Sequence, residues 1–384
     1  MTVLLVIVYM TFISLGLPDS LLGSAWPILH TVLNVPVEYA GILSFTTSIC
    51  TVIASLSAMW LNKRLGTGKT IAISTLMTSI ALFGYSFSPT FWFLIPFSLV
   101  LGLGGGAIDS ALNNYVALNY EAKHMSFLHA FWGLGATFGP LILSIGLSDN
   151  NYKFGYRTIA IIQLFLAIVQ FFFVKNFDNT EHHRNKSLES SKEAKNIIIG
   201  TSREWTSYLA MLAFFFYCSA ETSMFVWIST YGVNYLGFDA AVAARIASMF
   251  FIGITSGRIL SGIISDKIGI VNMIYFSTLV SAIAAFILLL NINSYVSIIS
   301  ILFIGFGFAS IYPSMIHRTP RRFGSFLSPK IIGFQMASAY VGSSITPPIV
   351  GVIMQKFGYN SLSILVVLFS ISIMLLTKII EVKK

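Results

Sequence analysis

The sequence predicts an all-α membrane protein in which twelve transmembrane helices form two pseudo-symmetric six-helix bundles. Three observations lead to this prediction: an apolar composition, a series of apolar stretches long enough to cross a bilayer, and a weak internal repeat. The chain is 56% hydrophobic and only 10% charged, whereas soluble globular proteins carry about 25% charged residues. This composition excludes an ordinary soluble protein.

Apolar stretches recur along the whole chain, separated mostly by short loops. A helix needs about 20 predominantly apolar residues to cross the hydrocarbon core of a bilayer. The stretches predict spans at residues 3–29, 38–61, 69–89, 92–118, 126–148, 156–176, 206–235, 239–264, 270–290, 294–317, 330–356 and 359–379. The first six spans define a predicted bundle over residues 1–176, and the last six define a second over 206–384.

Residues 177–205 separate the two predicted bundles. This segment is polar and charged and lacks an apolar pattern that could form a core. Such a composition predicts a cytoplasmic linker that is flexible or partly helical.

The distribution of basic residues predicts the orientation of the spans. With the N-terminus inside, 19 of the 23 lysines and arginines fall on the cytoplasmic side. Cytoplasmic loops of membrane proteins carry such an excess of basic residues. The net charge of +9 therefore reflects topology, and no nucleic-acid partner is expected.

An internal repeat relates the two halves. LGLGGGAID (101–109) aligns with IGFGFASIY (304–312), and KRLG (63–66) aligns with DKIG (266–269), both at an offset of 203 residues. Asp19 and Glu221 differ by 202 positions, and FWGLGATFGP (131–140) aligns with SAYVGSSITP (338–347) at an offset of 207. Similar offsets in the same order predict parallel repeats, which in transporters place the substrate site between the halves near the bilayer midplane.

Three acidic residues occupy apolar segments predicted to lie in the membrane: Asp19, Asp109 and Glu221. A carboxylate at the centre of a bilayer costs on the order of 2.5–3.5 kcal/mol on insertion scales, and such residues usually mark an ion or substrate path. These acids make the chain a transporter candidate.

Several segments resemble the major facilitator superfamily. GRILSGIISDKIG (257–269) is similar to the loop motif of that superfamily, whereas SAMWLNKRLGTGK (57–69) departs from it at Met59 and Lys63. More narrowly, GAIDSALNN (106–114), HAFWGLGATFGP (129–140), SAETS around Glu221 and FGFASIYPSMI (306–316) resemble patterns of the fucose–galactose–glucose:proton symporter group. Asp109 replaces the usual glutamate of that group, and Asn114 replaces a usual proline.

The resemblance implies that Asp19 and Asp109 carry the coupled proton, since the sugar symporters have acids in their first and fourth helices. Burial disfavours the charged form of a carboxyl group, so such a group can take up and release protons near neutral pH. Alternatively, one of the two is a structural acid that is hydrogen-bonded to Asn113 or Asn114.

Glu221 is predicted to serve both proton coupling and substrate binding. It precedes Phe225 and Trp227, and a carboxylate beside aromatic rings suits either a sugar or a cationic drug. Pairing with a basic group across the bundle is the structural alternative, but no intramembrane lysine or arginine is an obvious partner.

Further candidates for substrate contact are polar or aromatic side chains within the apolar spans. Amides can both donate to and accept from sugar hydroxyls, although buried amides also hold helices together. Asn113 lies one turn after Asp109 on the same helix face, and His129 shares a face with Trp132. The complete set of substrate candidates is Asn113, Asn114, His129, Trp132, Gln163, Glu221, Trp227, Tyr231, Tyr312, Gln335 and Tyr340.

Superfamily resemblance also implies a conformational latch at the inner surface, formed by Arg258 and Asp266. The glycines of LGLGGG and GLGATFG are predicted to allow close helix crossing. They do not form a phosphate loop, because no strand precedes them and no GK[ST] follows.

The sequence therefore predicts a proton-coupled symporter of a monosaccharide or similar polyhydroxylated solute, working by alternating access. Proton-driven export of drugs, sugar derivatives or lipid-like compounds by the same scaffold is the alternative. A membrane sensor or an intramembrane enzyme is disfavoured by the lack of a signalling domain or catalytic motif. We expect no enzymatic activity, cofactor or metal, and a monomer in the cytoplasmic membrane of a bacterium, with both termini cytoplasmic.

Overall fold

The first half of the chain folds into seven α-helices and one short 3-10 helix. The computed structural model describes residues 2–120, 122–188, 201–323 and 328–382. The elements of the first half are α1 (Thr2–Asp19), α2 (Leu21–Val32), η1 (Val37–Tyr39), α3 (Ala40–Leu65), α4 (Thr67–Phe87), α5 (Phe91–Asn119), α6 (Ala122–Leu147) and α7 (Tyr152–Leu188). The last of these helices continues into the segment predicted as a linker.

The second half folds into seven further helices: α8 (Thr201–Asn234), α9 (Ala240–Ile268), α10 (Ile270–Leu289), α11 (Ser294–Phe308), α12 (Ile311–Phe323), α13 (Ser328–Phe357) and α14 (Ser361–Val382). Across the residues that the structure describes, 12 helical stretches are long and apolar enough to cross a membrane. They coincide with the predicted spans, and the all-helical fold class is confirmed.

The first span is broken at Ser20, between α1 and α2. Pro18 has no N–H, so it cannot donate to the Ser14 carbonyl in the preceding turn. The side-chain amide of Gln163 in α7 donates to this carbonyl instead. Gln163 thus satisfies a backbone group that would otherwise be unpaired in the membrane, as broken membrane helices require.

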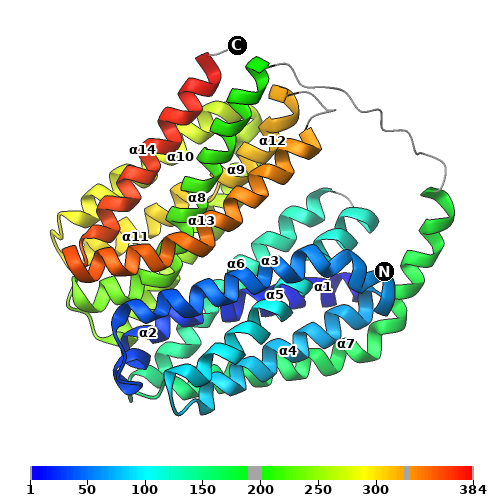
Figure 1. Cartoon of the computed structure of the whole chain (residues 1–384), viewed down its shortest axis with the longest axis horizontal. Helices are drawn as coiled ribbons and strands as arrows, with labels where there is room; N and C mark the ends of the chain where they lie inside the picture. The colour runs from blue at the N-terminus through cyan, green and yellow to red at the C-terminus, as the bar shows by residue number, and fades with distance from the viewer. Residues whose placement is uncertain (1, 121, 189–200, 324–327, 383–384) are drawn as a thin grey trace.

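Two bundles, α1–α7 and α8–α14, converge at the lower left of Figure 1 and diverge toward the end where the two termini lie. They touch where α2 packs on α8, α3 on α13, and α6 on α9. Near the converging end, Gly23 lies against α8 so closely that a Cβ there would lie 2.7 Å from the Val226 carbonyl oxygen. The halves are therefore in direct backbone contact on the side away from the termini.

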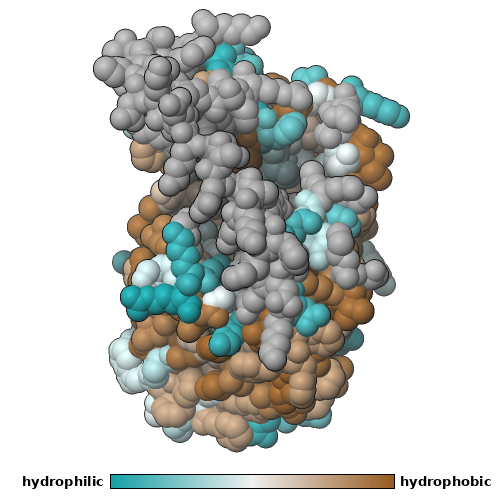
Figure 2. Space-filling view, turned by 90° about the vertical axis from the view of Figure 1, so that its right-hand side faces the viewer, coloured by the Kyte–Doolittle hydropathy of each residue, from teal (hydrophilic) through white to brown (hydrophobic). Residues whose placement is uncertain are grey.

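The end that carries the termini faces the viewer in Figure 2. Hydrophilic side chains form patches on this end, whereas apolar side chains cover the lower flank of the view. Large exposed apolar residues such as Phe165, Phe172 and Ile263 lie on spanning helices. An apolar belt below a polar end is the surface expected of a bundle that crosses a bilayer.

The glycine-rich stretch of α5 lets three helices approach closely. Gly102 and Gly106 lie against the backbone of α3 at Thr47 and Thr51. A Cβ added at Gly104 would lie only 2.8 Å from the Ser74 carbonyl oxygen of α4. Small residues at such contacts are typical of helix packing in membranes. The prediction that these glycines allow close crossing is confirmed.

Candidate functional site

A cavity of about 230 Å³ lies between the two bundles. The first half contributes most of its wall, from α1, α2, α3, α4, α5 and α7, and the second half contributes residues of α8 and α13. The lining residues are Pro18, Asp19, Leu22, Gly23, Ser44, Thr47, Ser48, Thr51, Leu82, Tyr85, Leu101, Tyr156, Thr222, Phe225, Val226, Tyr340 and Ser343. Clefts between helices of a bundle are common ligand sites.

Hydroxyl groups dominate the polar part of this wall. Ser44, Thr47, Ser48 and Thr51 follow one another in α3 at intervals of three, one and three residues. Residues at these intervals share one face of a helix, and this face points into the cavity. The hydroxyls of Tyr85 and Tyr156 belong to residues that line the same half of the cavity.

Asp19 lies at the break between α1 and α2, where it lines the cavity. Its carboxylate accepts a hydrogen bond of 2.8 Å from the indole Nε1–H of Trp132 in α6. Close contact between α1 and α6 makes this bond possible, because Gly16 and Gly135 each lie against the backbone of the other helix. The GLGATFG stretch thus brings a donor from the fifth span to an acid of the first.

Trp132 also contacts the second half. The guanidinium carbon of Arg258 in α9 lies 5.3 Å from the centre of a Trp132 ring, a separation at which a cation and an aromatic face attract each other. Arg258 pairs with Glu221 of α8, with 3.6 Å between the nitrogen and oxygen atoms. A continuous chain of contacts therefore runs from Asp19 through Trp132 and Arg258 to Glu221, and it crosses between the bundles.

The sequence analysis placed Arg258 in a predicted latch at the inner surface. In the structure it belongs to the spanning stretch Ala240–Ile264, and its side chain is 20% exposed. It is also the intramembrane partner that the sequence around Glu221 did not reveal. Asp266, the other predicted latch residue, belongs to α9, but its side chain lies outside the part that the structure describes.

Asp109 belongs to α5, within the spanning stretch Phe91–Val116. It accepts a hydrogen bond of 2.9 Å from the side-chain amide of Asn113. It is close enough to interact electrostatically with Asp19 and, across the interface, with Tyr312 and Tyr340. The fold thus brings the predicted acids of the first and fourth spans into one region.

Two of the predicted aromatic candidates also face this region. His129 lies near Arg258, and its ring meets that of Phe12 edge-on, with 6.0 Å between the ring centres. Tyr340 lines the cavity and hydrogen-bonds with Ser55 of the other half.

Other predicted candidates lie away from the cavity. Asn114 is exposed on α5. Trp227 is fully buried and donates to the Pro347 carbonyl at 2.8 Å. Tyr231 donates to the Leu288 carbonyl at 3.3 Å. The contacts of Trp227, Tyr231 and Gln163 hold helices together.

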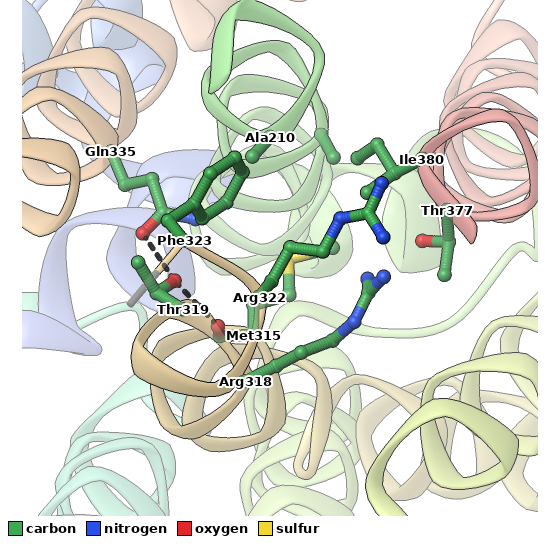
Figure 3. Close-up of a pocket in the computed structure, with 10 residues that line it drawn as sticks. Ala210, Met315, Arg318, Thr319, Arg322, Phe323, Gln335, Thr377 and Ile380 are labelled. Carbon is green, nitrogen blue, oxygen red and sulfur yellow. Dashed lines mark hydrogen bonds between the residues drawn. The ribbon is translucent and has the colours of Figure 1, made fainter. Parts of the chain in front are cut away.

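Gln335 lies in a separate small pocket at the terminus-bearing end of the second half (Figure 3). Its Oε1 accepts a hydrogen bond of 2.9 Å from Thr319. In Figure 3 the side chains of Arg318 and Arg322 extend from α12 toward Thr377 and Ile380 of α14. Arg318 forms an ion pair with Glu381, which ties α12 to α14.

The sequence analysis missed the hydroxyl face of α3 and the tyrosines Tyr85 and Tyr156. The signal was present in SFTTSICT (44–51), where hydroxyl residues recur at helical spacing in an apolar span. The tyrosines carried no such signal, because each is one of several aromatic residues in its helix.

Comparison with known proteins gives a consistent result. Residues 8–327 and 246–382 match the family model described as Major Facilitator Superfamily. The glucose/mannose transporter GlcP of Bacillus subtilis is 24% identical over 79% of this chain and 77% of its own length. The sodium-dependent glucose transporter 1 of Homo sapiens is 22% identical over 90% of this chain and 73% of its own length. The aspyridones efflux protein apdF of Emericella nidulans is 25% identical over 75% and 56%.

Proposed function

The chain belongs to the major facilitator superfamily, and from this premise we propose that it is a proton-coupled symporter of a neutral monosaccharide or similar polyhydroxylated solute. The family and the relatives are transporters, which confirms the prediction that the chain is not an enzyme. The two bundles, residues 1–176 and 206–384, would rock about the cavity between them. Residues 177–205 would connect the bundles.

The hydroxyl-rich wall of the cavity is the observation that carries this proposal. A sugar presents hydroxyl groups that both donate and accept, and the serine, threonine and tyrosine hydroxyls of the wall do the same. Four of them, at Ser44, Thr47, Ser48 and Thr51, come from one helix face. Such a wall matches a neutral polyol better than it matches a charged compound.

Asp19 and Asp109 support the proton-coupling part of the proposal. Asp19 lines the cavity, so a bound substrate would lie beside its carboxyl group. An ionised carboxylate without a cationic partner is costly inside a membrane. Protonation removes that charge, and the loaded carrier can then pass between its two open states at a lower energetic cost.

The proposal also specifies the membrane, the oligomeric state and the orientation of the protein. We propose that the protein works as a monomer in a bacterial cytoplasmic membrane, with both termini cytoplasmic. With this orientation, the bundles diverge toward the cytoplasm and converge toward the outer face (Figure 1). Sugar and proton would then enter from the other face after the bundles rock.

The test is external pH in de-energised cells that express the protein, recorded while a panel of sugars is added. Symport predicts that a transported sugar makes the medium alkaline, because protons enter with it. The response should disappear in Asp109→Asn. Sugar uptake that needs sodium and leaves the pH unchanged would replace the proton with sodium as the coupling ion.

Proton-driven export is the second candidate, and one observation favours it: among the described residues that line the cavity there is no amide, but there are four aromatic rings, of Tyr85, Tyr156, Phe225 and Tyr340. The carboxyl group that a cation would meet near these rings is that of Asp19, because Glu221 is paired with Arg258. If no sugar changes the pH, the same assay with amphipathic cations and glycolipids tests this candidate.

A further inference from the structure

The hydroxyl group of Tyr156 is buried and makes no hydrogen bond to the described part of the protein. Tyr156 is only 1% exposed, and its hydroxyl has no hydrogen-bond partner among the described residues. Buried hydroxyls are normally paired, so an unpaired one in a native protein calls for an explanation. Tyr156 lines the cavity between the bundles, where a ligand could supply the partner.

Neighbouring tyrosines hold the Tyr156 ring in a defined orientation. It stacks on Tyr85, with 5.3 Å between ring centres and 25° between ring planes. On another side, Tyr152 meets it nearly at right angles, with 6.3 Å between centres. Contacts of this geometry are favourable between aromatic rings. The ring of Tyr156 is therefore positioned in advance of any ligand.

The hydroxyl of Tyr85, the other member of the stacked pair, already makes hydrogen bonds within the protein. Tyr85 shares a hydrogen bond of 2.6 Å with Ser98 and another with Thr47. Thr47 belongs to the hydroxyl face of α3 that lines the same cavity. A hydrogen-bonded network thus runs from α5 through Tyr85 to α3, and Tyr156 lies beside it with its own hydroxyl unused.

We propose that the Tyr156 hydroxyl is a substrate contact that, together with the hydroxyl face of α3, recognises a hydroxyl group of the transported sugar. This inference rests on the proposed sugar substrate and adds a specificity-determining residue to it. A phenol can donate one hydrogen bond and accept others, so it suits a sugar hydroxyl in either role. A site built to hydrogen-bond a substrate hydroxyl rejects analogues that lack that hydroxyl.

Two matched variants, Tyr156→Phe and Tyr152→Phe, test the inference. Each removes only a tyrosine hydroxyl, and both hydroxyls are buried without a partner among the described residues. Only Tyr156 lines the cavity. Neither variant breaks a hydrogen bond among the described residues, so the melting temperature in detergent should stay the same or rise for both. A loss of transport in Tyr156→Phe alone would therefore report a lost contact with the substrate.

The measurement is KM for uptake of the sugar that the wild type transports, together with a series of its deoxy analogues. We expect Tyr156→Phe to raise KM at least tenfold, equivalent to about 1.4 kcal/mol, and Tyr152→Phe to leave KM unchanged. One deoxy analogue, lacking the hydroxyl that meets Tyr156, should have the same KM in the wild type and in Tyr156→Phe.

The outcomes separate this inference from the proposed function. If the wild type transports a sugar and Tyr156→Phe has an unchanged KM, the inference is overturned and sugar transport stands. An equal rise of KM in both variants also overturns it, because Tyr152 does not reach the cavity. If the wild type transports none of the sugars, the proposed function and the inference fail together.

Discussion

Asp19 in the first bundle and Glu221 in the second align in the predicted internal repeat, 202 positions apart, but their partners differ. Asp19 accepts a hydrogen bond of 2.8 Å from the neutral indole of Trp132. Glu221 pairs with the cation of Arg258 at 3.6 Å. The repeat thus places one acid in each half and gives only one of them a counter-charge.

This difference fits the proposal that the acids of the first half carry the coupled proton. Glu221 can remain ionised because Arg258 balances it, and removing either partner would leave the other charge buried and unpaired. Among the residues that the structure describes, Asp19 has a neutral donor but no cationic partner, and Asp109 accepts from the amide of Asn113 and has no cationic partner either. A proton that binds to the first bundle therefore changes the net charge of the cavity, which is what coupling requires.

The largest effect should come from neutralising the acids of the first bundle. Asp19→Asn and Asp109→Asn should each abolish proton-driven accumulation, because the variants cannot exchange a proton at that position, while exchange of substrate across the membrane continues. Accumulation and counterflow of labelled sugar in membrane vesicles measure the two activities. Accumulation at the wild-type level in either variant would remove that acid from the coupling mechanism.

Arg258→Gln removes the cation that balances the charge of Glu221 in the second bundle. It leaves Glu221 buried without its cation, and breaking a buried pair in this way typically costs about 3–5 kcal/mol. We expect a clear fall in the melting temperature and in the yield of folded protein. The double variant Arg258→Gln/Glu221→Gln removes both charges and should recover much of the loss. A double variant as unstable as the single one would show that the ion pair is not the reason for the loss.

Two tryptophans allow a narrower comparison, because each donates its indole N–H to a different half. Trp132→Phe removes the donor to Asp19, and a hydrogen bond to a charged group contributes about 1.5–3 kcal/mol. We expect a roughly tenfold slower uptake with little change in folding. Trp227→Phe removes the donor to the Pro347 carbonyl and should cost about 1 kcal/mol of stability, with unchanged uptake per folded molecule. The reverse pattern would contradict the assignment of coupling to the first bundle.

The smallest effects should distinguish two adjacent amides. Asn113 donates to Asp109 at 2.9 Å, whereas Asn114 is exposed. Asn113→Ala should slow uptake several-fold, because the ionised form of Asp109 loses its donor. Asn114→Ala should change stability by less than about 0.5 kcal/mol, as surface substitutions usually do, and leave uptake unchanged. Equal uptake defects in both would place Asn114 in the substrate path instead.

Helix existence and order could be predicted from the sequence because the membrane imposes a simple rule. Each span must satisfy its own backbone hydrogen bonds, so length and hydropathy suffice to find it. The break at Ser20 was not predicted, because Pro18 can be accommodated in a membrane helix with or without a break. What stabilises it is the amide of Gln163, which lies 149 positions beyond the freed Ser14 carbonyl in the sequence.

The candidate site was predicted only in part. The acids could be found because a carboxyl group in an apolar segment is conspicuous wherever it lies. The hydroxyl face of α3 was missed, since serine and threonine are common in membrane helices and usually bond to their own backbone, as Thr46 and Thr51 do here. Tyr156 could not be distinguished from other tyrosines without knowing that it lines a cavity.

By itself, the sequence determined that the chain is a polytopic membrane protein and that three acids lie within its spans, because composition and periodicity are local properties. Only the tertiary structure decided which partner each acid has. Glu221 and Arg258 are 37 positions apart, and Asp19 and Trp132 are 113 positions apart. Whether a buried carboxyl group meets a cation or a neutral donor depends on how the helices cross, and helix crossing follows from packing across the whole molecule.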